Sequence, residues 1–324
     1  MKKAYLFLTS FLVSLPFWIG LNLLQTQAEI FLNTKNSSFI LNAKINQEFI
    51  CPLDAISAES FLIVSVNKQG NNTVLFEKNP NDELPIASLT KLMTYLVANE
   101  FYKNEQDIAV ANILSGVNTL KVKELIPIML IESSNDAAFA LTKVIGEAGF
   151  LDLMNFKAKE LGLLQTHFYN PTGVDPEAYN MPQDQINYST ANDIAKLTKN
   201  LIFNLPADAS PARITTQGVD SGHQAMQAGQ SEFLKIVSQK EYLLFKEEKL
   251  VSTLKNTNEL LGEIPEVIGG KTGTTDRAGE CLMVIMKLNN SNENEYAIAV
   301  ILNSKNRFDD MKMFLNCAKN NGVN

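Results

Sequence analysis

Residues 85–97 read PIASLTKLMTYLV, and this stretch decides the local fold and the chemistry to expect from it. After Ser88, apolar side chains recur at the spacing of a helix that packs one face on a core. They are Leu89, Leu92, Met93, Leu96 and Val97. Ser88 therefore opens a helix. Lys91 lies three residues further on and shares its face, so the amine can reach the Ser88 hydroxyl.

The Ser-x-x-Lys spacing alone is a weak signal, because it also occurs from Ser65 to Lys68. That copy lies beside the apolar run of residues 61–66, which is typical of a strand. Positions three apart on a strand point to opposite faces. The second copy therefore cannot bring an amine to a hydroxyl.

Two more polar clusters follow in a fixed order: Ser-Ser-Asn at residues 133–135 and Lys-Thr-Gly at 271–273. Alone, the first is typical of a helix end and a cap, and the second of a turn after a strand. Together with residues 88–91, they supply a nucleophile, a base, a proton relay and a strand edge for a peptide. This combination predicts serine acyl-transfer chemistry.

Composition narrows the function classes. The 324 residues are 45% hydrophobic, which suffices for one large domain or two small ones. The net charge of −7 and the absence of a basic stripe argue against a nucleic-acid partner. With two histidines and no zinc-type spacing, the sequence predicts no metal ion and no cofactor.

The N-terminus predicts export. Lys2 and Lys3 precede an apolar run from Tyr5 to Leu24, so residues 1–28 are interpreted as a signal peptide or a membrane anchor. The uncleaved anchor is the favoured alternative. Residues 29–54 are then a spacer. We expect the protein at the outer face of the cytoplasmic membrane or elsewhere in the cell envelope, attached to the membrane through this segment.

Strands are predicted near both ends of the rest of the chain, with a helical lobe at about residues 95–261 between them. The predicted strands are 61–68, 73–77, 267–273, 281–288 and 296–302, and a helix at 306–318 closes the chain. One sheet built from both ends beside a helical lobe leaves a cleft between them as the natural site. Residues 205–230 are interpreted as an exposed insertion or lid. Of the three cysteines, Cys281 and Cys317 are interpreted as small buried hydrophobes rather than a disulfide.

From Ala55 to Ala318 the sequence resembles the serine D-alanyl-D-alanine carboxypeptidases, the low-molecular-mass penicillin-binding proteins. The shared phrases are PIASLTKLMT at 85–94, ESSNDAA at 132–138, NPTGVD at 170–175, YSTAND at 188–193, GKTGTT at 270–275 and AGEC at 278–281. The resemblance implies an α+β fold of the β-lactamase/transpeptidase type: a five-stranded antiparallel sheet with flanking helices and an inserted all-helical subdomain. Residues 55–324 would form this catalytic domain.

The resemblance also implies a role for each residue of the site. Ser88 is the expected nucleophile and Lys91 its base, with the pKa of Lys91 lowered by burial and by Lys271. Ser133 is expected to pass the proton to the leaving group, and Asn135 to hold the substrate backbone. The residues expected to bind substrate along the strand and after it are Lys271, Thr272, Gly273, Thr274 and Arg307. Gly273 is expected to allow close approach of the substrate.

The expected reaction is removal of the terminal D-alanine from a peptidoglycan stem peptide, with β-lactam antibiotics as acylating inhibitors. A D,D-endopeptidase that cleaves cross-links is the first alternative. A serine β-lactamase is less favoured because the middle region has no Glu-x-x-Leu-Asn phrase. A non-catalytic wall-binding protein is less favoured because all the reactive residues are retained.

Overall fold

The computed structural model describes residues 55–67, 72–203, 231–246, 248–288 and 295–320. The predicted N-terminal segment and spacer and the 205–230 insertion lie outside these residues, so those interpretations stay predictions. No helix within the described part of the chain is both long enough and apolar enough to cross a bilayer.

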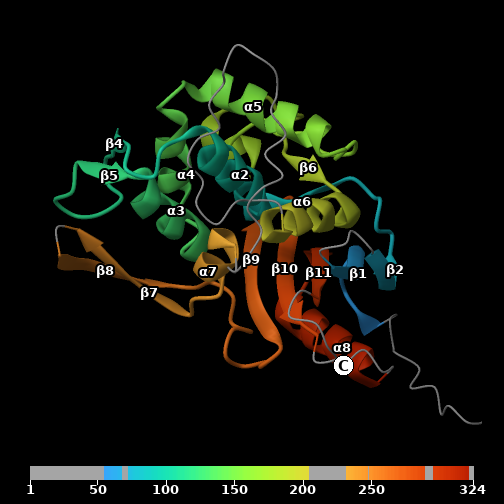
Figure 1. Ribbon diagram of the computed structural model, residues 1–324. Helices are drawn as coiled ribbons and strands as arrows, with labels where there is room; N and C mark the ends of the chain where they lie inside the picture. The colour runs from blue at the N-terminus through green and yellow to red at the C-terminus, as the bar shows by residue number, and fades with distance from the viewer. Residues whose placement is uncertain (1–54, 68–71, 204–230, 247, 289–294, 321–324) are drawn as a thin grey trace, which may run out of the picture. The chain divides into compact units, whose positions relative to one another are not determined.

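A five-stranded antiparallel sheet is built from both ends of the chain, in the order β2-β1-β11-β10-β9 (Figure 1). Its strands are β1 (Ser60–Asn67), β2 (Asn72–Lys78), β9 (Val267–Thr275), β10 (Gly279–Lys287) and β11 (Glu295–Ser304). Each was predicted to within a few residues. The sheet forms because apolar side chains recur on both faces of its central strands, which therefore need cover on both sides.

Alternation along β10 separates two cores. Met283 and Ile285 pack into the larger core under the helical lobe, and Leu282 and Val284 pack into the smaller one. The smaller core is covered by α8 (Arg307–Asn320), the predicted closing helix, which brings Phe314 edge-on to Phe61. The sheet is thus fixed between two layers, and β9 is left at its edge beside the helical lobe (Figure 1).

The helical lobe lies between β2 and β9 in sequence. Its helices are α2 (Lys91–Phe101), α3 (Val122–Ile131), α4 (Asn135–Thr142), α5 (Glu147–Glu160), α6 (Ala191–Phe203) and α7 (Glu232–Val237), with short 3-10 turns η2 (Ala87–Thr90) and η3 (Pro176–Tyr179). α6 begins after Thr190, whose hydroxyl accepts the Asp193 amide at 3.0 Å.

The lobe also contains strands that were not predicted, so it is not wholly helical. They are the hairpin β7 (Glu241–Lys246) with β8 (Lys249–Lys255), and the short pairs β3 (Leu84–Pro85) with β6 (Tyr188–Ser189) and β4 (Asp107–Ala109) with β5 (Thr119–Lys121). In β7 the apolar residues Leu243 and Phe245 are exposed while Leu244 is buried. Apolar side chains on both faces hide the alternation that identifies a strand.

The cysteine interpretation is half right. Cys281 on β10 is free and buried, as expected of a small hydrophobe. Cys317 on α8 is disulfide-bonded, which corrects its interpretation as a buried thiol. Because the Cys281 thiol is free, the two residues do not pair with each other.

Candidate active site

Ser88 lies in the tight 3-10 turn η2, which runs directly into α2, so it stands at the start of the helix as predicted, but in a 3-10 turn rather than in the α-helix itself. The residue before it, Ala87, has φ 45°, a left-handed conformation that costs a non-glycine residue free energy. Two neighbouring segments hold the turn. A Cβ on Gly173 would lie 1.8 Å from the Ala87 carbonyl oxygen, and one on Gly273 would lie 2.9 Å from the Ser88 amide nitrogen. Tertiary contact, not helix propensity, therefore sets the position of Ser88.

Lys91 begins α2 and is wholly buried. Its Nζ lies 2.7 Å from Ser88 Oγ, 2.8 Å from Asn135 Oδ1 and 2.8 Å from the Thr172 carbonyl oxygen. Burial, and then the charge of Lys271, hold the pKa of Lys91 well below its usual value. A neutral amine has two hydrogens and one lone pair. It can donate to the Asn135 and Thr172 oxygens while its lone pair accepts the Ser88 proton.

Lys271 projects from β9 and donates to Ser133 Oγ at 2.8 Å and to the Thr272 carbonyl at 2.8 Å. It is almost fully buried, and burial, followed by the charge of Arg307, lowers its pKa to about 7. Ser133 lies between α3 and α4 with φ 62°, a strained conformation that turns its hydroxyl to this lysine. Two buried lysines thus approach the site from the helical lobe and from the edge strand.

Asn135 begins α4, and the preceding residue, Ser134, caps that helix by accepting the Ala137 amide at 3.2 Å. The cap predicted for Asn135 in isolation is therefore supplied by its neighbour. Because Asn135 Oδ1 accepts from Lys91, its Nδ2 group is the part of the amide that remains for another partner.

The strand residues after Lys271 make hydrogen bonds with different partners. The Thr272 hydroxyl is 2.6 Å from that of Thr257, and a hydroxyl keeps capacity for a further bond after one contact. Thr274 donates its hydroxyl to the Gly273 carbonyl at 2.8 Å. Arg307, at the start of α8, donates Nη1 to that carbonyl at 3.0 Å and to the Thr274 hydroxyl. The structure therefore brings all the predicted strand residues and Arg307 to one edge.

Gly273 has a different neighbour from the one expected. The sequence suggested that its missing side chain leaves room for substrate. Instead, a Cβ at this position would meet Ser88 N at 2.9 Å, and Ala87 Cβ and Ile86 O at 3.1 Å. Gly273 is therefore needed for β9 to pack against the turn that carries Ser88.

The loop at residues 170–174 and Asn187 belong to the site, although neither was predicted to. Asn187 is buried, and its Nδ2 donates to Thr90 Oγ1 at 3.0 Å and to the Asn170 carbonyl at 2.8 Å. Its Oδ1 accepts the amides of Tyr169 and Asn170. The side chain thus joins the loop that supplies the Thr172 carbonyl to the turn that carries Ser88. The NPTGVD phrase was the only sequence signal for this loop.

The described residues contain no cluster of three or more histidine, cysteine or acidic side chains able to hold a metal ion. The reactive groups of the site are instead two hydroxyl–amine pairs. The Ser88 hydroxyl lies 2.7 Å from the Lys91 amine, whose pKa is lowered, and the Ser133 hydroxyl is hydrogen-bonded to the buried Lys271 amine. Such an arrangement can generate an alkoxide and move its proton.

Comparison with known proteins identifies the family. The sequence profile of the D-alanyl-D-alanine carboxypeptidases, peptidase family S11, matches residues 46–113 and 99–220, which together are more than half of the chain. The chain belongs to this family. The matched part of the S11 chain contains Ser88, Lys91 and Ser133, and Lys271 lies beyond it.

Two relatives of this S11 chain are named for different activities. D-alanyl-D-alanine carboxypeptidase DacF of Bacillus subtilis is 31% identical over 245 residues, covering 70% of this chain and 53% of the relative. D-alanyl-D-alanine endopeptidase of Escherichia coli is 29% identical over 250 residues, covering 72% and 69%. The match thus spans about half the length of the Bacillus relative.

Solved structures share the fold. Penicillin-binding protein D2 of Listeria monocytogenes, crystallised with ampicillin bound, has a TM-score of 0.60 and 27% identity, with 81% of this chain and 98% of that chain covered. The Streptomyces K15 DD-transpeptidase has a TM-score of 0.61 at 22% identity, with 82% and 98% covered. The predicted α+β fold of the β-lactamase/transpeptidase type is therefore confirmed.

Proposed function

We propose that this S11 chain is a serine D,D-carboxypeptidase that removes the terminal D-alanine from peptidoglycan stem peptides. The observation that carries the proposal is the 2.7 Å contact between Ser88 Oγ and the buried Nζ of Lys91, whose pKa is lowered. A family that acts on peptidoglycan works outside the cytoplasm, which agrees with the predicted export segment.

In the first step, the Ser88 oxygen attacks the carbonyl carbon of the penultimate D-alanine while the Ser88 proton passes to Lys91. The negative charge that develops on the carbonyl oxygen is stabilised by the amides of Ser88 and Thr274, because the turn η2 that carries Ser88 packs against strand β9 at Gly273. Loss of one such donor costs roughly 3 kcal/mol in related chemistry.

In the second step, the peptide bond breaks and the departing D-alanine nitrogen takes a proton from the Ser133 hydroxyl, which Lys271 holds at 2.8 Å. The proton that Lys91 took from Ser88 replaces the one lost by Ser133, so Lys91 is again a neutral amine. Asn135 Nδ2 binds the substrate backbone. The terminal carboxylate is bound by the Thr272 hydroxyl with Arg307 and Lys271 as nearby cations. Water then attacks the acyl carbon while neutral Lys91 accepts a proton from it, and Lys91 returns that proton to the Ser88 oxygen as the ester bond to Ser88 breaks. A β-lactam would acylate Ser88 in the same way.

An endopeptidase that cleaves cross-links is the second candidate, because the Escherichia coli relative named for that activity is 29% identical and is covered over 69% of its length. The two activities share every step above. They differ in the amine that leaves when the scissile bond breaks, which is free D-alanine for the carboxypeptidase and the neighbouring stem peptide for the endopeptidase.

The test is incubation of the purified protein with a pentapeptide monomer and with a cross-linked dimer, followed by mass spectrometry. Loss of one D-alanine from the monomer with an intact dimer supports the carboxypeptidase. Conversion of the dimer to monomers supports the endopeptidase. Turnover of neither, with rapid penicillin hydrolysis, would favour a β-lactamase, and binding of peptidoglycan without any turnover would favour a wall-binding protein.

A further inference from the structure

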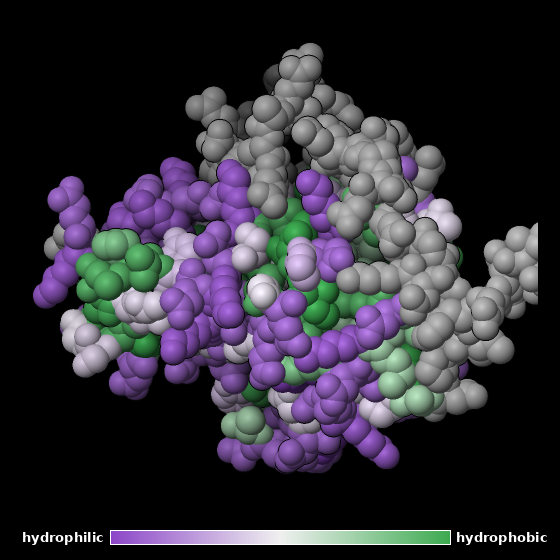
Figure 2. All heavy atoms as spheres, turned by 90° about the horizontal axis from the view of Figure 1, so that it is seen from below, coloured by the Kyte–Doolittle hydropathy of each residue, from purple (hydrophilic) through white to green (hydrophobic). Residues whose placement is uncertain are grey.

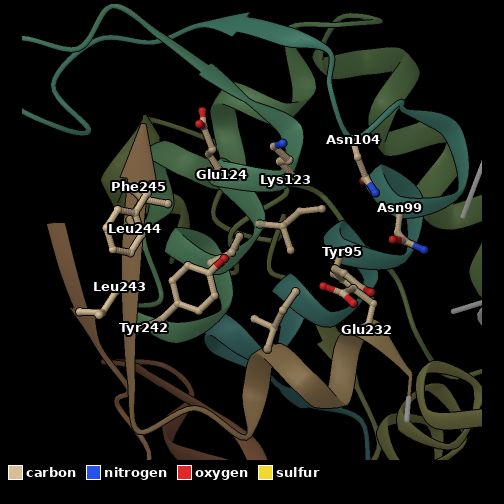
Figure 3. Close-up of a pocket in the computed structure, with 13 residues that line it drawn as sticks. Tyr95, Asn99, Asn104, Lys123, Glu124, Glu232, Tyr242, Leu243, Leu244 and Phe245 are labelled. Atoms are coloured by element: carbon tan, nitrogen blue, oxygen red, sulfur yellow. The ribbon is translucent and has the colours of Figure 1, made fainter. Parts of the chain in front are cut away.

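A second cavity lies in the helical lobe, and none of its lining residues belongs to the candidate active site (Figure 3). Its volume is about 400 Å³, within the range of roughly 300–1,000 Å³ typical of small-molecule sites. Its walls come from α2, α3, α7 and β7, with Asn104 from the loop after α2. Tyr95 on its wall is one helical turn beyond Lys91, so the cavity and the active site share α2.

The inner wall carries a polar group that lacks a partner. The Tyr95 side chain is fully buried, and its hydroxyl makes no hydrogen bond among the described residues. Its ring is fixed against Phe233, with centroids 5.3 Å apart. A buried hydroxyl without a partner costs free energy, which a ligand hydroxyl or amide at this wall would recover. Burial and then the Glu232 charge raise the pKa of Tyr95, so it stays a neutral donor and acceptor.

The other polar groups around the cavity are mixed in kind. They are Asn99, Asn104, Lys123, Glu124, Glu232 and Tyr242. The charged ones already have partners: Glu124 accepts the Lys121 amide at 2.7 Å, Lys123 pairs with Glu105, and Glu232 lies 3.8 Å from Lys235. The amides and the two tyrosine hydroxyls therefore remain to bind a ligand, and they favour an uncharged one with several hydroxyl or amide groups.

Apolar side chains complete the cavity. Ile126, Pro127 and Ile236 form part of its wall, and Leu243 and Phe245 on β7 stand about half exposed at its rim. Figure 2 shows apolar surface at the left edge of the molecule, where Figure 1 places the β7–β8 hairpin. Apolar side chains of β7 on one side of the cavity and amides and a hydroxyl on the other (Figure 3) suit a ring with one C–H face and a polar edge.

We propose that this cavity is a saccharide site that binds an N-acetylated amino-sugar unit. The source of the sugar rests on the proposed function: it would be the glycan that carries the stem peptide. The site would then hold the polymer while residues 88–91 and the edge strand act on its peptide.

The test is titration of the protein with N,N′-diacetylchitobiose, followed by saturation-transfer NMR. Saturable binding is expected, weakened roughly fivefold in Tyr95→Phe because one hydrogen bond is lost. Tyr102→Phe is the matched control: Tyr102 also has a buried hydroxyl without a partner among the described residues, but it does not line the cavity. Asn104→Ala should weaken binding, whereas Asn118→Ala, at an exposed asparagine away from the cavity, should not.

Fluorescent penicillin labelling of Ser88 in the same samples separates this proposal from the proposed function. Labelling without disaccharide binding would overturn the saccharide site alone. Equal binding by the wild type, Tyr95→Phe and Asn104→Ala would place the sugar elsewhere and overturn it too. Binding of cadaverine in preference to the disaccharide would identify a cation site instead. Loss of labelling with intact disaccharide binding would count against the catalytic assignment only.

Discussion

Substitution of Gly273 by alanine should slow acylation by moving the turn that carries Ser88, the proposed nucleophile. The new Cβ would lie 2.9 Å from Ser88 N, whereas ordinary contacts begin at 3.4 Å, so one backbone must retreat by about half an ångström. The clashing atoms at Ser88 and Ile86 belong to the main chain and cannot rotate away. A misplacement of about 1 Å costs roughly 10²-fold in rate, so we expect a loss of roughly tenfold.

Gly269→Ala is the matched control on the same strand. Its Cβ would meet Val237 Cγ2 at 3.0 Å and Leu234 Cδ1 at 3.2 Å, which are side-chain ends that can move. Both variants overpack the protein and should lower the free energy of unfolding by about 1–3 kcal/mol. Only Gly273→Ala should slow acylation.

The assay is the second-order rate of labelling by a fluorescent penicillin, measured beside urea unfolding of each variant. A Gly273→Ala protein that is labelled as fast as the wild type would refute the reasoning. So would an equal loss of rate in Gly269→Ala, because the effect would then follow stability rather than the position of the turn.

Lys91→Ala should lower the labelling rate at pH 7 by roughly 10²–10⁴-fold, because no other base touches Ser88 among the described residues; a near-normal rate would exclude Lys91. In the wild type, a stopped-flow pH profile of the labelling rate should rise at a pH well below the ordinary pKa of a lysine amine, because burial and the charge of Lys271 lower the pKa of Lys91 and the fraction of neutral amine increases with pH. Lys271→Met removes one cause of that lowering, so this rising limb should move to higher pH, and an unmoved limb would contradict the coupling. Asn187→Ala should lower the free energy of unfolding in urea by about 2–4 kcal/mol, because buried groups at Asn170 and Thr90 lose their partner; unchanged stability would refute this account of the loop.

The sheet and the closing helix could be predicted because their apolar residues follow simple periods. The place of Ser88 in a 3-10 turn could not be. It depends on the left-handed Ala87 and on contacts with Gly173 and Gly273, which are distant in sequence. A periodic pattern of apolar residues indicates which face of a helix is buried, but it does not indicate whether the first turn is a 3-10 turn or an α-helical one.

The proposed catalytic and binding residues could be predicted because the expectation rested on side chains. The groups that support them could not, because they are a backbone atom and a side chain distant in sequence. The Thr172 carbonyl that accepts from Lys91 is a backbone atom, and any residue could supply it. Asn187 lies 97 positions from Thr90, the side chain it bonds. Nothing in a single sequence indicates such a pair.

Covalent labelling of Ser88 tests the central claim most directly. The wild type and Ser88→Ala are incubated with benzylpenicillin, and intact mass and peptide mapping follow. We expect one penicilloyl group on Ser88 in the wild type and none in Ser88→Ala. Equal labelling of both proteins, or an adduct on another residue, would contradict the assignment of Ser88 as the nucleophile.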